Sequence, residues 1–455
     1  MGNRMSTTVE QAGTSKVSDQ TFHASNAYRW YVVWLLFVVY VFNFVDRQIL
    51  QILIEPIRKE FNFTDTQLGL LSGLAFAVLY SVLGIPIARY ADRANRVNII
   101  SIALFVWSLF TVLTGRAQNF LQLFAARVAV GIGEAGCSPP AYSIIGDYFE
   151  KARRTTAIAI YSMGIYGGVF VGYITGAQIA ERFGWRTAFY VVGIPGIVLA
   201  LILKLTLREP PRGYAEGVVT SATPPPFFQV LGRLFTKATF WHLSLATALH
   251  AFVGYGVNGF HPSFLIRSHG LSVGDAGTVL AIVSAVSGVG GTWFGGWLAD
   301  KMTQWRGDVR WQMLTPGIAT LLNVPAAILA YSLGDTNIVI ATMFVSLVFG
   351  VMYLGPSYAT MQRLVDVRER ALGSAVLLLI VNLIGLGLGP TLVGVVSDIF
   401  YERFMAEGMA EALAKADGLR YALIVMVCIN VWSFIHYMIG AKTLVRDSVG
   451  DEPHK

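Results

Sequence analysis

The chain has 455 residues, of which 55% are hydrophobic and only 13% are charged. A soluble domain of average composition carries about 25% charged residues, so this composition argues against an ordinary globular enzyme or binding domain. The formal net charge of +7 is spread over short loops and therefore does not indicate a nucleic-acid partner.

Apolar runs of about 20 residues recur along almost the whole chain, and each is long enough to cross a bilayer core of about 30 Å. Lipid offers no hydrogen-bond partners to the backbone, so such runs must be helices. We predict an all-α membrane protein with twelve spans, near residues 30–52, 67–90, 97–115, 119–146, 155–181, 185–207, 238–267, 274–299, 311–332, 337–361, 371–400 and 419–441. Residues 401–417 are too polar to span and are expected to form an amphipathic interfacial helix.

The spans divide into two halves. We expect a polar N-terminus at 1–29, a six-helix half at 30–207, a linker at 208–236, a second six-helix half at 237–442 and a tail at 443–455. The linker contains Pro224-Pro225-Pro226, which cannot continue a helix. Lys and Arg are more frequent in the loops on the linker side, so both termini and the linker are expected in the cytoplasm. No cleavable signal peptide is visible. We expect a monomeric integral membrane protein, in the inner membrane if the chain is bacterial.

A weak internal repeat supports two related halves. Ala88-Arg89-Tyr90-Ala91-Asp92-Arg93 follows the second span, and Gly296-Trp297-Leu298-Ala299-Asp300-Lys301 follows the eighth. Each places a small residue four positions before an Asp that a cation follows. Parallel repeats of six spans are a known transporter architecture.

These segments resemble the major facilitator superfamily, as do Arg127-Val128-Ala129-Val130-Gly131-Ile132-Gly133 in span 4 and Phe183-Gly184-Trp185-Arg186 before span 6. The first Asp-containing turn departs from the family pattern at Ala88, Asn95 and Val97. More narrowly, Asn43-Phe44-Val45-Asp46-Arg47 together with Gly131-Ile132-Gly133-Glu134-Ala135 resembles the Spinster branch. The resemblance implies two pseudo-symmetric six-helix halves around a central cavity and transport by alternating access. It also implies a lipid-like cargo of the lysophospholipid or sphingolipid type.

Among the ionisable residues inside predicted spans, four stand out: Asp46, Arg47, Arg127 and Glu134. Such residues each cost about 2.5–3.5 kcal/mol by insertion scales, so they indicate function by default. Their depths along the spans suggest that Asp46 and Arg127 are partners, which leaves Glu134 less clearly paired. A carboxyl group without a cation in a medium of low dielectric holds its proton more readily. Glu134 is therefore the first candidate for proton coupling and Asp46 the second, with Arg127 and Arg47 in the charge network. The alternative is a purely structural ion-pair network.

The two cytoplasmic turns are expected to act as conformational latches. A carboxylate at the end of a span can pair with a loop cation or a helix N-terminus and so hold one state. Asp92, Arg93 and Asp300 are the candidates. Simple anchoring at the membrane interface is the alternative for Asp300.

The second half contributes polar and aromatic side chains in place of charges. Spans 7 and 10 carry candidates for the cavity lining, namely Tyr255, Asn258, His261, Tyr353 and Tyr358. Taken one at a time, each of them fits a satisfied interior position better than a ligand contact. A charged first half facing an apolar, aromatic second half suits an amphiphile with a charged head.

The sequence contains no G-x-x-x-x-G-K-[ST] loop for a nucleotide and no His or Cys pattern for a metal. We therefore expect no cofactor and no enzymatic activity, with protons, a small amphiphilic substrate and membrane lipids as partners. A proton-coupled transporter of an amphiphile is the leading hypothesis. The alternatives are a proton-coupled organic-anion symporter, a non-transporting receptor on the same fold, and a membrane enzyme acting on lipids, for which no nucleophile or metal cluster is found.

Overall fold

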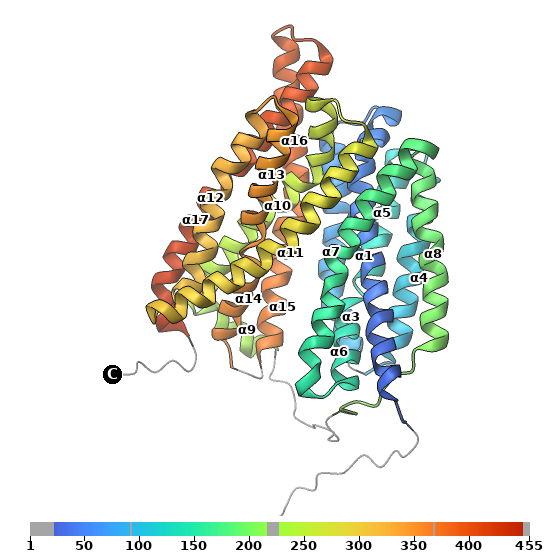
Figure 1. The fold of residues 1–455 in the computed structure, drawn as a ribbon, viewed down its shortest axis with the longest axis vertical. Coiled ribbons are helices and arrows are strands. Elements are labelled where there is room, and N and C mark those ends of the chain that lie inside the picture. The colour runs from blue at the N-terminus through green and yellow to red at the C-terminus, as the bar shows by residue number, and fades with distance from the viewer. Residues whose placement is uncertain (1–21, 92, 216–226, 367–368, 449–455) are drawn as a thin grey trace, which may run out of the picture.

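A computed structural model describes residues 22–91, 93–215, 227–366 and 369–448. The described chain is a bundle of long helices without strands (Figure 1). Eleven helices or joined helix pairs are long and apolar enough to cross a membrane. A further helix of 32 residues, α10 (Ala238–His269), packs against α17 and is less apolar because it carries polar residues such as His250, Asn258 and His261. The predicted all-α fold with twelve spans is confirmed.

The first six spans form what is called here the N-terminal half. Its helices are α1 (Asn26–Phe61), α2 (Asp65–Ser72), α3 (Leu74–Ala91), α4 (Arg96–Thr114), α5 (Phe120–Glu134), α6 (Ser138–Tyr148), α7 (Lys151–Phe183) and α8 (Trp185–Thr206). The second and fourth spans are each built from two helices, α2 with α3 and α5 with α6.

The remaining helices form the C-terminal half. They are α9 (Phe227–Phe235), α10, α11 (Val273–Arg306), α12 (Trp311–Ser332), α13 (Thr336–Val351), α14 (Leu354–Arg363), α15 (Arg370–Ile380), the π-helical segment η2 (Val381–Leu388), α16 (Gly389–Ala406) and α17 (Glu411–Asp447). The halves pack together mainly through α7 against α11 and α2 against α16.

Proline breaks the fourth span at a position that matters for the site. Pro139 and Pro140 have no N–H to donate to the preceding turn, and α5 ends at Glu134 just before them. Glu134 is therefore the last residue of α5, where the chain bends before α6 begins at Ser138.

The two ends of the bundle are named here by their connections. The linker end is where α8 ends and α10 begins, and the hairpin end is the opposite one, where α16 and α17 meet. In Figure 1 the α16–α17 connection projects beyond the other helices at the top. The predicted interfacial helix at 401–417 is wrong, because this segment consists of the last turns of α16 and the first turns of α17. The two helices are joined by a turn in which Gly408 has a φ of 83°, and pairs such as Arg403–Glu407 support the helix ends.

Candidate functional site

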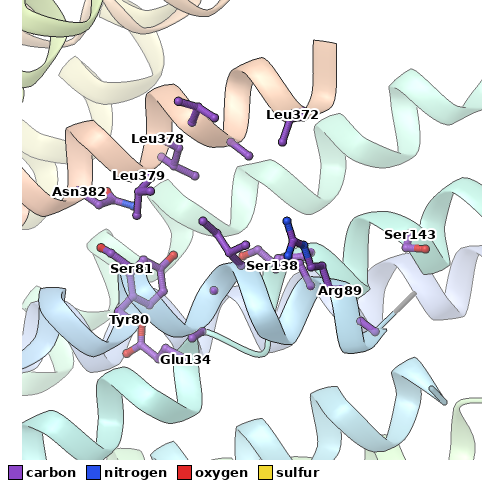
Figure 2. Close-up of a pocket in the computed structure, with 18 residues that line it drawn as sticks. Tyr80, Ser81, Arg89, Glu134, Ser138, Ser143, Leu372, Leu378, Leu379 and Asn382 are labelled. Atoms are coloured by element: carbon purple, nitrogen blue, oxygen red, sulfur yellow. The ribbon is translucent and has the colours of Figure 1, made fainter. Parts of the chain in front are cut away.

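A cavity of about 410 Å³ opens between the halves toward the linker end. It is called the linker-end cavity here. On one side lie α3, α5 and α6, and on the other lie α15 and η2. In Figure 2, Leu372, Leu378 and Leu379 of α15 face Tyr80, Ser81, Arg89 and Ser138 of the N-terminal half. The α15 wall is apolar, and Glu134 contributes a carboxylate to the opposite side.

Glu134 forms a buried ion pair with Arg47. Its Oε2 accepts a hydrogen bond of 2.7 Å from Arg47 Nε. The Arg47 guanidinium also lies 4.7–5.0 Å from the ring centres of Phe44, Phe76 and Tyr80, in range for cation–π attraction. The expectation that Glu134 lacks a clear partner is therefore wrong, because Arg47 turns toward span 4 while Asp46 turns away.

The second oxygen of Glu134 has a different environment. Glu134 is 1% exposed, and its Oε1 makes no hydrogen bond of normal geometry within the described chain, although the buried amide of Asn43 lies close enough to interact with the carboxylate. A buried polar atom without a partner is costly. Protonation of the free oxygen would remove the cost of an incompletely bonded carboxylate, so the geometry leaves room for a proton at Oε1.

Asp46 lies inside the N-terminal half, away from the linker-end cavity. Its carboxylate is 2.5–2.6 Å from Thr111 Oγ1 of α4, and that hydroxyl also lies 2.9 Å from the Trp107 carbonyl. Arg127 reaches only the backbone carbonyl of Asp46, at 3.5 Å. The expected carboxylate–guanidinium pair between Asp46 and Arg127 is therefore not formed.

A second cavity, of about 170 Å³, lies deeper between the halves and is called the central cavity here. The N-terminal half contributes Arg47 and Arg127, and α10 contributes Tyr255, Asn258 and His261. Arg47 lines this cavity while Glu134 lines the linker-end cavity. Their ion pair therefore stands between the two spaces.

The other two candidates for cavity lining lie elsewhere. Tyr353 packs edge-on against the ring of His250, with the ring centres 4.5 Å apart. Tyr358 is partly buried beside an apolar cluster of the C-terminal half. Both are outside the residues that line the two cavities above.

Two of the three latch candidates can be placed, and within the described residues no hydrogen bond or ion pair of Arg93 or Asp300 to the other half is seen. Asp92 lies outside the described residues, and Arg93 is exposed in the turn after α3. Asp300 accepts a hydrogen bond of 2.8 Å from Gln312 of α12, within the same half. It lies inside α11, which continues to Arg306 beyond the predicted end of the span.

At the hairpin end, a buried charge network joins the halves. Arg267 of α10 donates to Glu55 of α1 at 2.9 Å and forms two hydrogen bonds of 2.7 and 2.8 Å with Asp65 of α2. Their side chains are 6%, 1% and 8% exposed. Asp398 of α16 adds a contact by accepting from the backbone N–H groups of Asp65 and Thr66, at 3.0 and 2.8 Å. This hairpin-end network closes the bundle opposite the linker-end cavity.

The comparisons with known proteins agree with this architecture. The model of the Major Facilitator Superfamily matches residues 36–443. A solved bacterial homolog of the human lysosomal transporter Spinster, inward-facing and unoccupied, is 36% identical with a TM-score of 0.87, over 94% of this chain and 100% of the other. The chain belongs to the major facilitator superfamily, in its Spinster-like branch.

Two relatives extend the comparison for this Spinster-like chain. An MFS-type efflux pump of Mycolicibacterium smegmatis is 31% identical over 420 residues, which are 92% of this chain and 94% of the pump. Protein spinster homolog 1 of Xenopus laevis is 25% identical over 435 residues, covering 91% of this chain and 81% of the homolog. The family resemblance seen in the sequence is confirmed. The chain is a membrane transporter of a small molecule, and its family consists of transporters and not enzymes.

Sequence reasoning missed several residues of this Spinster-like site. The apolar wall of α15 was counted only as part of a span, because leucines facing a cavity and leucines facing lipid look the same in one sequence. Arg267 stands at the very end of the predicted span 238–267, where a cation is expected to reach water, but in the structure it is buried in the last turn of α10. Its partners Glu55 and Asp65 lie 212 and 202 positions away, so no local pattern connects them.

Proposed function

We propose that this transporter is proton-coupled and moves an amphiphilic, lipid-like molecule of the lysophospholipid or sphingolipid type by alternating access. The observation that carries the proposal is the buried Arg47–Glu134 pair at the boundary between an apolar-walled cavity and a central cavity with two arginines.

The shape and lining of the two cavities suit an amphiphile. Small-molecule sites are concave and mostly apolar, with a few convergent polar groups, in volumes of about 300–1,000 Å³. The linker-end cavity of about 410 Å³ lies in that range, and its α15 wall suits an acyl chain. Arg47 and Arg127 lie beyond it in the central cavity, where a phosphate or carboxylate headgroup would find two cations.

Proton binding at Glu134 supplies the coupling. A proton on Glu134 Oε1 removes the negative charge that holds Arg47, and the released guanidinium becomes available to an anionic headgroup. Because coupling between two sites is reciprocal, bound substrate in turn favours the proton. Asp46 is the second proton site in this scheme, and Arg127 keeps the region near the headgroup positive.

Alternating access assigns roles to the two ends. The linker end faces the cytoplasm in this proposal, because its loops hold the larger share of Lys and Arg. The described conformation is then inward-facing, in keeping with the inward-facing state of the solved Spinster homolog. Asp92, Arg93 and Asp300 are proposed to latch the halves together only after the linker end closes.

The test is proton-driven flux by Glu134→Gln in proteoliposomes. Gln keeps the shape of the side chain but cannot exchange a proton or hold Arg47 as an ion pair. We expect uptake of radiolabelled lysophospholipid to stop responding to an imposed pH gradient while the protein remains folded and monodisperse. Glu407→Gln is the matched control, because Glu407 is exposed and its ion pair among the described residues is with Arg403, one helical turn away. Full pH-driven flux in Glu134→Gln would exclude Glu134 as the coupling site.

A second candidate is proton-coupled symport of a small organic anion. Arg47 and Arg127 both line the central cavity of about 170 Å³, which is large enough for a compact anion. The same vesicles separate the two candidates when lysophospholipids, sphingolipids and short-chain organic anions compete for uptake. Competition by the organic anions alone would favour this second candidate, and absence of any flux would favour a receptor.

A further inference from the structure

The C-terminal half holds a polar cluster that the proposed function does not use. Its members come from four helices and are all buried: His250 of α10, Thr320 and Asn323 of α12, Ser346 of α13 and Asn430 of α17. It is called the His250 cluster here. Polar groups inside a span are costly unless they bond to one another, so the directions of these hydrogen bonds are informative.

The contacts of Ser346 determine which groups donate and which accept along the cluster. Asn323 Nδ2 lies 2.7 Å from the Ser346 carbonyl oxygen and 3.0 Å from its hydroxyl. A backbone carbonyl can only accept, so the amide of Asn323 must present its nitrogen there. Its oxygen then accepts from Asn430 Nδ2 at 3.0 Å. This in turn leaves the oxygen of Asn430 against His250 Nδ1, at 3.1 Å.

The other ring nitrogen of His250 also faces an oxygen. Nε2 lies 2.8 Å from the Gly350 carbonyl, which can only accept. Thr320 Oγ1, 3.2 Å from Nδ1, is a hydroxyl and can accept or donate. A neutral imidazole protonated at Nε2 can accept from Thr320, but its Nδ1 lone pair then also faces the Asn430 oxygen. Only the imidazolium, with two N–H donors, donates to both the Gly350 carbonyl and the Asn430 oxygen.

We propose that His250 is a proton-binding site in the C-terminal half, distinct from Glu134, and that the His250 cluster is arranged to hold its imidazolium form. The hydrogen-bond directions, anchored at two backbone carbonyls that cannot flip, assign this role. Burial itself opposes the charge, so the cluster binds the proton reversibly and does not carry a fixed cation.

The groups around His250 do not supply a counter-charge. The ring of Tyr353 packs edge-on against it, and the described residues that line the adjoining small cavity of about 50 Å³ carry no Asp, Glu, Lys or Arg. The other titratable groups of that lining, His261 and Tyr331, bond to each other at 2.9 Å. The proton on His250 is therefore held by neutral oxygens alone, which favours easy exchange.

A polar route connects this site with the centre of the transporter. Asn258 and His261 line both the small cavity beside His250 and the central cavity that contains Arg47 and Arg127. The small cavity has room for about one water, whose share of liquid volume is about 30 Å³. Asn258 and His261 thus offer protons a short polar path between the central cavity and the small cavity beside His250. Because the cluster ties α10, α12, α13 and α17 together, loss of the proton changes how these helices fit.

The test is the protonation state of His250, read from the imidazole ¹⁵N spectrum of the full chain in nanodiscs with labelled histidine. The His250 signals are assigned by their loss in His250→Gln. We expect both ring nitrogens to become protonated as the pH falls from about 8 to 5. Asn430→Asp, which places a carboxylate against Nδ1, should move that transition upward by about one pH unit or more, whereas Thr320→Ser should leave it unchanged. His261 is the internal control, because the Tyr331 hydroxyl can serve either neutral tautomer.

A His250 that keeps one unprotonated nitrogen down to about pH 5 would overturn the proposal. A protonation transition whose midpoint pH is the same in Asn430→Asp as in the parent protein would overturn it as well. The measurement needs no transport activity, so a failure here is distinguishable from a failure of the proposed function. A role for this proton in transport does rest on that function, and requires the pH profile of flux to move with Asn430→Asp.

Discussion

The two ends of the bundle are held in opposite ways. At the hairpin end, Arg267 of one half is bonded to Glu55 and Asp65 of the other, and all three are nearly excluded from solvent. At the linker end, α15 and α3 face each other across a cavity of about 410 Å³. The contrast indicates that polar contacts at the hairpin end stabilise the described conformation. The linker end, which has a cavity in place of such contacts, is open to the substrate.

Charged contacts between the halves allow the hairpin end to open again. Apolar side chains that separate become exposed to water at a cost in free energy, whereas separated carboxylates and guanidinium groups are stabilised by hydration. Buried ion pairs therefore add little net stability over their separated, hydrated partners, yet removing one partner is strongly destabilising. The hairpin-end network thus closes tightly without making the opposite conformation inaccessible.

The largest expected effect comes from Arg267→Met. It removes the cation that Glu55 and Asp65 share. Glu55 keeps its pair with Arg58 at 2.6 Å, but Asp65 becomes a buried carboxylate without an ion-pair partner among the described residues, at a cost of about 3–5 kcal/mol to this conformation. That corresponds to about 100-fold or more in the equilibrium between conformations. We expect the hairpin end to open, seen by electron spin resonance as a longer distance between labels at the exposed positions Gln118 and Ser332.

Arg186→Met is the matched control for this prediction. Arg186 pairs with Glu60 at the same end but within the N-terminal half, and the two side chains are 35% and 42% exposed. An exposed pair contributes at most about 1 kcal/mol, so the label distance should stay as in the parent. If Arg267→Met also leaves the distance distribution unchanged, the hairpin-end network does not select the conformation.

The sequence predicts the membrane spans well but not the contacts between their charged side chains. Helix length and apolar pattern predict the spans, because bilayer thickness alone sets them. Depth along a span made Asp46 and Arg127 the expected partners and left Glu134 less clearly paired, but depth does not fix the direction of a side chain. The pairing depends on rotation about each helix axis, where Arg47 and Asp46 differ by about 100°. The sequence therefore located charged residues within the spans, but it paired Asp46 with Arg127 where the structure pairs Arg47 with Glu134.

A second, smaller effect is expected from Gly69→Ala at the hairpin end. A Cβ on Gly69 of α2 would lie 2.3 Å from the Pro390 carbonyl oxygen and 2.8 Å from Thr391 Cα of α16. Backbone atoms cannot swing aside, so the halves must separate, at a cost of about 1–3 kcal/mol. We expect a lower melting temperature and a partial shift toward the open hairpin-end distance.

Gly84→Ala tests the same substitution at the linker end. Gly84 lines the linker-end cavity, and a Cβ there would meet nothing within 4 Å. The melting temperature and the label distance should therefore match the parent protein or show a slight stabilisation, since Ala is favoured over Gly in a helix. Equal destabilisation by the two variants would contradict the contrast between a packed hairpin end and an open linker end.

The smallest effect is expected from Asp398→Asn. This variant tests whether Asp398 acts by bonding across the two halves or only by capping a helix. Asp398 accepts from the Asp65 and Thr66 N–H groups and so stabilises the start of α2 from the other half. Asp335 does the same for α13 within one half, accepting from the Asn337 and Ile338 N–H groups. Asp398→Asn replaces one of two accepting oxygens with an amide nitrogen and removes a charge beside a helix N-terminus, which costs about 1 kcal/mol. Asp335 accepts both N–H groups at Oδ1, so Asp335→Asn keeps both bonds and removes only the charge.

Both variants should lower the melting temperature slightly, Asp335→Asn less than Asp398→Asn. Only Asp398→Asn should also raise the population with an open hairpin end, by about fivefold for 1 kcal/mol, because only Asp398 bonds across the halves. An equal response of the label distance to Asp335→Asn would mean that the distance reports general loosening of the bundle and not release of one half from the other.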